Sequence, residues 1–79
     1  MNVADYKFFS IEQRPPVTGK KTQTYAVVSR SQGVELGCIR WYGAWRQYFF
    51  FPCGETLWSD GCLADLTSFL QRLRAERNS

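Results

Sequence analysis

Short runs of hydrophobic residues, separated by polar, Gly or Pro residues, occupy the first two thirds of the chain. Each run is rich in aromatic or β-branched residues, which is typical of β-strands. The pattern predicts strands at residues 6–11, 24–30, 34–41 and 45–51. Because the turns at 31–33 and 42–44 are short, the last three strands are expected to form an antiparallel meander, with the N-terminal segment as a fourth strand.

After residue 52 the hydrophobic spacing changes from that of strands to the three- and four-residue spacing of an amphipathic helix. The apolar stripe consists of Cys62, Leu63, Leu66, Phe69, Leu70 and Leu73. It predicts a helix over about 61–76, whose first amides Ser59 or Asp60 can cap. The basic residues near its end, which suit the helix dipole, are Arg72, Arg74 and Arg77.

These elements predict an α+β fold, in a single domain over residues 1–79. A three- to four-stranded antiparallel sheet would pack one face against the C-terminal helix, because the helix stripe needs an apolar partner. Residues 13–23 contain Pro15, Pro16 and Gly19 and are expected to form a mobile, solvated loop. Within this loop, Lys20 and Lys21 are either solvated loop residues or contacts to a phosphate backbone.

The hairpin between the last two predicted strands decides which aromatic residues share a face. With Tyr42, Gly43 and Ala44 as its loop, Trp41 would face Trp45. Alternation would then place on one face Ile39, Trp41, Trp45, Phe49 and Phe51. The other face would carry Leu36, Cys38, Arg40, Arg46, Tyr48 and Phe50. A slip of one residue would exchange the two faces, and one helix can cover only one of them.

Composition and charge narrow the classes of function. The 79 residues include 13 aromatic ones and carry a net charge of +3, which permits an acidic protein or nucleic acid as partner. The chain has no histidine, so catalysis by a Ser-His-Asp or Cys-His arrangement is excluded. Cys38, Cys53 and Cys62 have no zinc-site spacing; only Cys53, beside Pro52, suggests a reactive thiol. We therefore expect no enzymatic activity, no metal and no cofactor.

The sequence also bears on localisation. No basic segment followed by an apolar run opens the chain, and the longest apolar run, 48–51, is far too short to cross a bilayer. These features predict a cytoplasmic protein of a bacterial or infected host cell, without a membrane partner.

The most distinctive segment runs from Ile39 to Pro52. It has the form IxWYxxWRQY, followed by an aromatic run and Pro, and then by a Gly-Cys-Leu-x-Asp helix start at 61–65. In these motifs, residues 37–73 resemble a family of small uncharacterised proteins of bacteria and their phages. The resemblance implies a fold and a phage or bacterial setting, and it implies no mechanism. The N-terminal half carries no part of the resemblance.

The leading hypothesis is a small binding protein that modulates a phage or bacterial complex by protein–protein contact. The residues expected to bind the partner are Arg40, Trp41, Tyr42, Trp45, Arg46 and Tyr48. Trp, Tyr and Arg dominate interface hot spots, but aromatic residues at strand spacing are also typical of a core. One alternative is nucleic-acid binding, with Arg40 and Arg46 on phosphates and the neighbouring aromatics on bases. Another is self-association through the uncovered face of the sheet, and the oligomeric state stays open.

Overall fold

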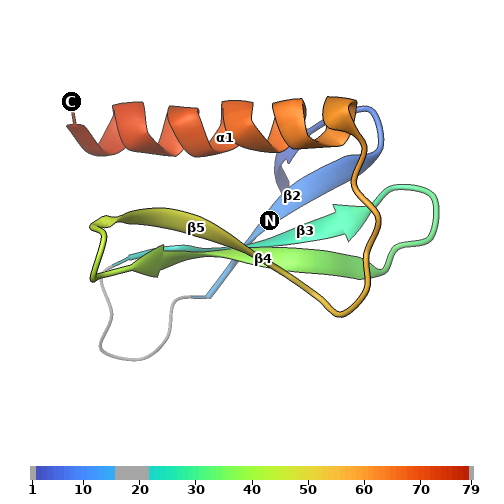
Figure 1. Ribbon diagram of the computed structural model, residues 1–79, viewed down its shortest axis with the longest axis horizontal. Helices are drawn as coiled ribbons and strands as arrows, with labels where there is room; N and C mark the ends of the chain where they lie inside the picture. The colour runs from blue at the N-terminus through green and yellow to red at the C-terminus, as the bar shows by residue number, and fades with distance from the viewer. Residues whose placement is uncertain (1, 16–21, 79) are drawn as a thin grey trace.

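The computed structural model describes residues 2–15 and 22–78, which form an antiparallel sheet with one helix lying across it (Figure 1). The five strands are β1 (Asn2–Asp5), β2 (Phe9–Arg14), β3 (Thr24–Ser29), β4 (Glu35–Tyr42) and β5 (Gln47–Pro52). They lie side by side in the order β1-β2-β3-β4-β5, so each strand pairs with its neighbour in sequence. The helix α1 (Asp60–Asn78) follows β5. The protein is therefore an α+β protein with a five-stranded meander and one C-terminal helix.

The number of strands corrects the prediction of three to four. The predicted strand at 6–11 spans a turn, because the Tyr6 amide donates to the Phe9 carbonyl at 2.8 Å and reverses the chain there. The residues before this turn form β1, which is too short and too polar to stand out in the sequence.

The predicted loop at 13–23 also begins two residues later than expected. Gln13 and Arg14 belong to β2, where they pair with Tyr25 and Thr24 of β3. Polar residues can extend a strand where its backbone hydrogen bonds to the neighbouring strand continue. The side chains of Gln13 and Arg14 therefore did not indicate that they belong to β2. Residues 16–21, which include Lys20 and Lys21, lie outside the described residues.

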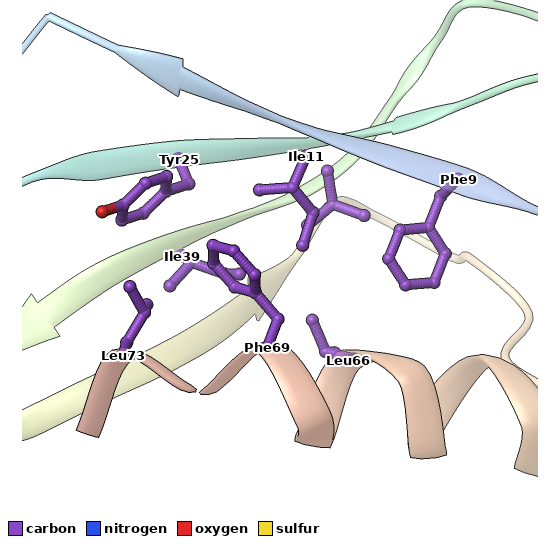
Figure 2. Close-up of a cluster of buried hydrophobic side chains, with 8 residues drawn as sticks. Phe9, Ile11, Tyr25, Ile39, Leu66, Phe69 and Leu73 are labelled. Atoms are coloured by element: carbon purple, nitrogen blue, oxygen red, sulfur yellow. The ribbon is translucent and has the colours of Figure 1, made fainter. Parts of the chain in front are cut away.

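The core lies between α1 and the face of the sheet formed by alternate residues of β2, β3 and β4 (Figure 2). Its side chains, all less than a tenth exposed, are Phe9, Ile11, Tyr25, Val27, Ile39, Leu66, Phe69 and Leu73. The last three follow helical spacing, so they project from one side of α1 toward the sheet. The edge of the Phe69 ring meets Tyr25, with 5.4 Å between the ring centroids. The core thus fixes which face of the sheet α1 covers.

The connection from β5 to α1 is fixed by a cap and by one tryptophan. The Ser59 hydroxyl accepts a hydrogen bond from the Cys62 amide at 3.2 Å, which makes Ser59 the N-cap residue of α1. The Trp58 ring packs against Phe9 and Phe50, with centroid distances of 5.9 and 4.9 Å. Together these contacts set where α1 begins above the sheet.

The register of the β4–β5 hairpin differs from the predicted one. Trp41 pairs with Tyr48, and Ile39 pairs with Phe50, so Trp41 does not face Trp45. The loop has four residues, 43–46, and Arg46 closes it with a left-handed φ of 53°. The pairing is displaced by an odd number of residues from the predicted one, and therefore the aromatic side chains of β5 exchange faces.

Candidate binding surfaces of the β4–β5 hairpin

The structure divides the six predicted partner-binding residues between the two faces of the hairpin. Trp41 and Tyr48 point to the face that α1 covers, on the same side as the core residue Ile39. Arg40 and Tyr42 point to the opposite, outer face. The two remaining residues, Trp45 and Arg46, lie in the exposed turn. The sequence therefore indicated the hairpin as the candidate region, but it did not show that the hairpin distributes these residues over two surfaces.

The first surface is an outer aromatic patch, which we define as Arg40, Tyr42, Trp45, Phe49 and Phe51. Phe49 is its centre, with ring centroids 5.2 Å from Tyr42 and 5.6 Å from Trp45. The Arg40 guanidinium lies over the Phe51 ring, 4.1 Å from its centroid. Tyr42 is 43% and Trp45 67% exposed. The rings therefore hold one another in place while presenting apolar surface to solvent.

The second surface is a groove of about 530 Å³ on the other side of the hairpin, which we call the β5 groove. Its lining consists of Trp41, Arg46, Gln47, Tyr48, Phe49, Phe50, Thr67, Leu70, Gln71 and Arg74. The β4–β5 hairpin supplies the aromatic floor, where Trp41 and Tyr48 meet edge to face at 5.3 Å. One flank of α1 supplies the wall, and Arg74 joins wall to floor by donating to the Gln47 side-chain oxygen at 2.9 Å.

The wall of the groove shows what the sequence interpretation missed. Leu70 packs against the core, as its place in the predicted apolar stripe implies, and Arg74 lies near the helix end, but both residues also line the groove. Thr67, Leu70 and Arg74 recur at helical spacing about a quarter turn from the core residues of α1. The helical spacing of this second stripe, beside the main apolar stripe, is the feature of the sequence that could have predicted the wall.

The charges of the groove are of one sign. Arg46 and Arg74 are its charged lining residues, and no carboxylate joins them among the described residues that form the lining. The other flank of α1 is different, since Arg72 is paired there with Glu76 at 3.2 Å. The groove thus combines an aromatic and aliphatic interior with a positive rim.

Cys53 lies apart from the groove, where the chain leaves β5. Its thiol donates to the Glu35 carboxylate at a sulfur–oxygen distance of 3.9 Å. Desolvation, followed by the negative charge of Glu35, raises the pKa of the Cys53 thiol above its usual value. The thiol is therefore less ionised at neutral pH than a free cysteine, which does not favour nucleophilic chemistry.

Replacing Glu35 with glutamine is expected to increase the rate at which iodoacetamide alkylates Cys53 at pH 7.5. The change removes a negative charge beside the thiol, so the pKa falls and, at a pH below it, the thiolate fraction rises. We expect a rate increase of roughly two- to threefold. Peptide mass spectrometry over time measures the rate for Cys53 separately from Cys38 and Cys62. Glu12→Gln is the matched control, and an equal rate increase in both variants would contradict the assigned cause.

The described part of the chain holds no group of three or more His, Cys, Asp or Glu side chains that could bind a metal ion. Within the same residues, no helix is long and apolar enough to cross a membrane. Lys20 and Lys21, the predicted phosphate contacts, lie outside the described residues.

The chain is thus a small α+β protein in which an aromatic β-hairpin forms both a solvent-facing patch and a groove beside the helix. Over 59 residues the chain is 34% identical to the "Uncharacterized 9.3 kDa protein" of Acholeplasma phage L2, covering 75% of this chain and 76% of the phage protein. The chain belongs to the family of this phage protein. No family model matches the chain, and no solved structure matches it. The resemblance based on the IxWYxxWRQY motif stays a prediction.

Proposed function

We propose that this protein is a non-enzymatic binding module that modulates a phage or bacterial protein by contact through the outer aromatic patch. The observation that carries the proposal is the exposure of Trp45 and Tyr42 around Phe49, next to the Arg40 guanidinium. Trp, Tyr and Arg are the residues that contribute most to interface hot spots. Their mutual packing also reduces the entropy lost when a partner binds.

The charges of the outer face favour a protein over a nucleic acid as partner. Glu12 lies on this face, in the lateral row that runs through Ala26 and Cys38 to Phe51. Arg14 lies 3.7 Å from the Glu35 carboxylate, which offsets its charge. Across the described residues of this face, positive and negative charges are therefore mixed, whereas binding to a phosphate backbone favours a uniform positive potential. The relationship to a phage protein supports a setting in a bacterial or infected cell.

Site-specific photo-crosslinking tests the proposal. A benzophenone amino acid replaces Tyr42 in the patch, and a matched protein carries it at Phe8, an aromatic residue 54% exposed and outside the patch. After irradiation in lysate of the bacterial host, the Tyr42 position should form discrete protein adducts that the Phe8 position does not form. Equal adducts at both positions would contradict the proposal. Nuclease-sensitive adducts would support nucleic-acid binding instead, and adducts of twice the protein's mass would support self-association.

Trp45→Ala in the protein with the crosslinker at position 42 is expected to reduce the adducts by about tenfold, because each 1.4 kcal/mol of lost contact corresponds to a factor of ten. The free energy of unfolding should change by less than about 1 kcal/mol, since Trp45 is mostly exposed. Urea denaturation followed by circular dichroism measures the second quantity. Undiminished adducts with Trp45→Ala would exclude Trp45 from the contact.

A further inference from the structure

Strand β5 forms one edge of the sheet, and among residues 2–15 and 22–78 no strand pairs with the other side of its backbone. The Cys53 amide donates to the Leu36 carbonyl at 2.9 Å, which fixes the phase of hydrogen bonding between β4 and β5. In an antiparallel ladder the peptide groups of successive residues alternate in direction. Phe49 and Phe51 therefore direct their peptide groups toward β4, and Tyr48 and Phe50 direct theirs toward the free edge.

Native proteins usually protect such an edge with charged residues, a bulge or a covering element. Between Tyr48 and Phe51 this edge strand has four aromatic residues in succession and no charge. Pro52 is in the outward register, so its missing amide removes no bond to β4 but ends the row of free donors after Phe50. The composition of the strand is thus suited to pairing along its free side.

The β5 groove lies on this side of the molecule and is bounded above by α1. Tyr48 and Phe50 belong both to its floor and to the free edge. On the flank of α1 that forms the wall, Leu63 lies two helical turns before Leu70 on the same stripe and is 48% exposed. A strand added about 4.8 Å from β5 would place alternate side chains under this flank, since that distance is the normal strand spacing.

The rim of the groove selects the charge of its occupant. Arg46 and Arg74 both line the groove, and among its described lining residues no acidic side chain offsets them. Arg46 also has a left-handed φ of 53°, a conformation that glycine or asparagine adopts at lower cost. An arginine at this turn position supplies the groove with a guanidinium group, although its backbone is strained. Backbone strain of this kind is concentrated at functional positions of proteins.

We propose that the β5 edge and the β5 groove bind an extended acidic peptide segment of a partner protein. The segment pairs as a sixth strand with the outward peptide groups of Tyr48 and Phe50. On its α1-facing side, the central side chains are apolar and enter the groove. The terminal side chains of the same side are carboxylates, one of which lies near Arg46 and Arg74. This recognition by strand addition takes affinity from main-chain hydrogen bonds and specificity from the pocket.

This site differs from the outer aromatic patch, because the two lie mainly on opposite faces of the hairpin and share only Phe49. A second copy of the chain is a less suitable occupant, since each copy carries a net charge of +3. A nucleic acid is also less suitable, because two guanidinium groups provide few phosphate contacts. An acidic peptide can form main-chain hydrogen bonds with the free edge and place carboxylates beside the positive rim.

Amide chemical shifts of the ¹⁵N-labelled protein, recorded during titration with synthetic peptides, test the proposal. The probe is the blocked peptide ETVTVTET, in which Val and the two Glu lie on one face of the strand. The control is KTVTVTKT, which keeps the apolar positions and has the opposite charge. With the acidic peptide at up to about 2 mM, saturable shifts are expected at Tyr48, Phe50, Leu70 and Arg74. No shifts with the acidic peptide, or equal shifts with both peptides, would overturn the proposal.

Two protein variants make the result specific to the groove. Arg74→Glu is expected to weaken binding of ETVTVTET by about tenfold or more, because it reverses a charge on the rim. Arg72→Glu makes the same change on the opposite flank of the same helix, where the side chain faces Glu76, and should weaken binding at most about threefold. Equal losses in both variants would show general charge attraction and overturn the assigned site.

Two further measurements separate the main-chain contacts and the alternative occupants. ETVTVTET with N-methylated amides on one edge should bind at least about tenfold more weakly, because methylation removes donors of the new ladder. Unchanged binding after methylation of either edge would overturn strand addition. Stronger β5 shifts with an eight-nucleotide oligothymidine, or β5 shifts that depend on protein concentration alone, would assign the groove to nucleic acid or to a second copy.

Discussion

Phe69→Ala should lower the free energy of unfolding by about 3–5 kcal/mol, the cost typical of removing a fully buried aromatic side chain. Phe69 is 1% exposed and lies at the centre of the contact between α1 and the sheet (Figure 2). Its ring contacts Tyr25 edge to face, so the substitution also removes an aromatic pair. A chain of this length has a total stability of about 4–12 kcal/mol, so the variant is expected to be partly unfolded or close to it.

Urea denaturation measured by circular dichroism checks this result. The urea midpoint should fall by about 1 M or more, because m-values of small domains are about 1–3 kcal/mol per molar urea. Phe8→Ala is the matched control, since it makes the same chemical change at an exposed position, and its cost should stay below about 1 kcal/mol. Similar midpoints for the two variants would contradict the packing of α1 described above.

Gly37→Ala should destabilise the protein by about 1–3 kcal/mol, the usual cost of forcing an extra group into a packed site. A Cβ atom at this position would lie 2.5 Å from the Phe50 ring and 2.7 Å from the Phe51 carbonyl oxygen. The glycine therefore allows the Phe50 ring to lie across β4, where it contacts Trp58 and forms part of the groove floor. The same substitution should also perturb peptide binding by the β5 groove.

A double-mutant cycle with Phe50→Leu tests this cause. Leucine lacks the ring atoms that the new Cβ would meet, so the double variant should be more stable than the sum of the two single effects by about 0.5 kcal/mol or more. Gly61→Ala, in the first turn of α1, is the matched control, because its Cβ would lie 3.9 Å from the Ser59 hydroxyl oxygen, an ordinary contact distance. There alanine should raise stability by up to about 1 kcal/mol. Strict additivity in the cycle would contradict the assigned clash.

The comparison of β1 with α1 shows which elements could be predicted. The helix repeats its apolar spacing over many residues, and Ser59 provides a recognisable cap, so its position was evident from the sequence. Strand β1 has only four residues and is half polar, so its own sequence carries little signal. Its pairing with β2 stabilises it, and such pairing is a property of the folded chain rather than of the segment.

The two binding surfaces, like the strands, could be predicted only in part from the sequence. The aromatic hairpin with Arg40 and Arg46 was recognisable from composition, because such residues are enriched at interfaces. Its division into an outer patch and a groove depended on the pairing of Trp41 with Tyr48. That pairing follows from a four-residue loop that Arg46 closes in a left-handed conformation, which is an unusual choice for arginine and gave no advance signal.

By itself, the sequence determined the fold class, the position of the helix and the segment that carries the aromatic and basic residues. These features follow from local periodicity and composition, which each segment contains within itself. Only the tertiary structure decided the number of strands, the faces of β5 and the meeting of Arg46 with Arg74 beside one groove. Strand register and the flank that a helix presents depend on contacts between distant segments, and a change of one residue in a turn exchanges the faces of a strand.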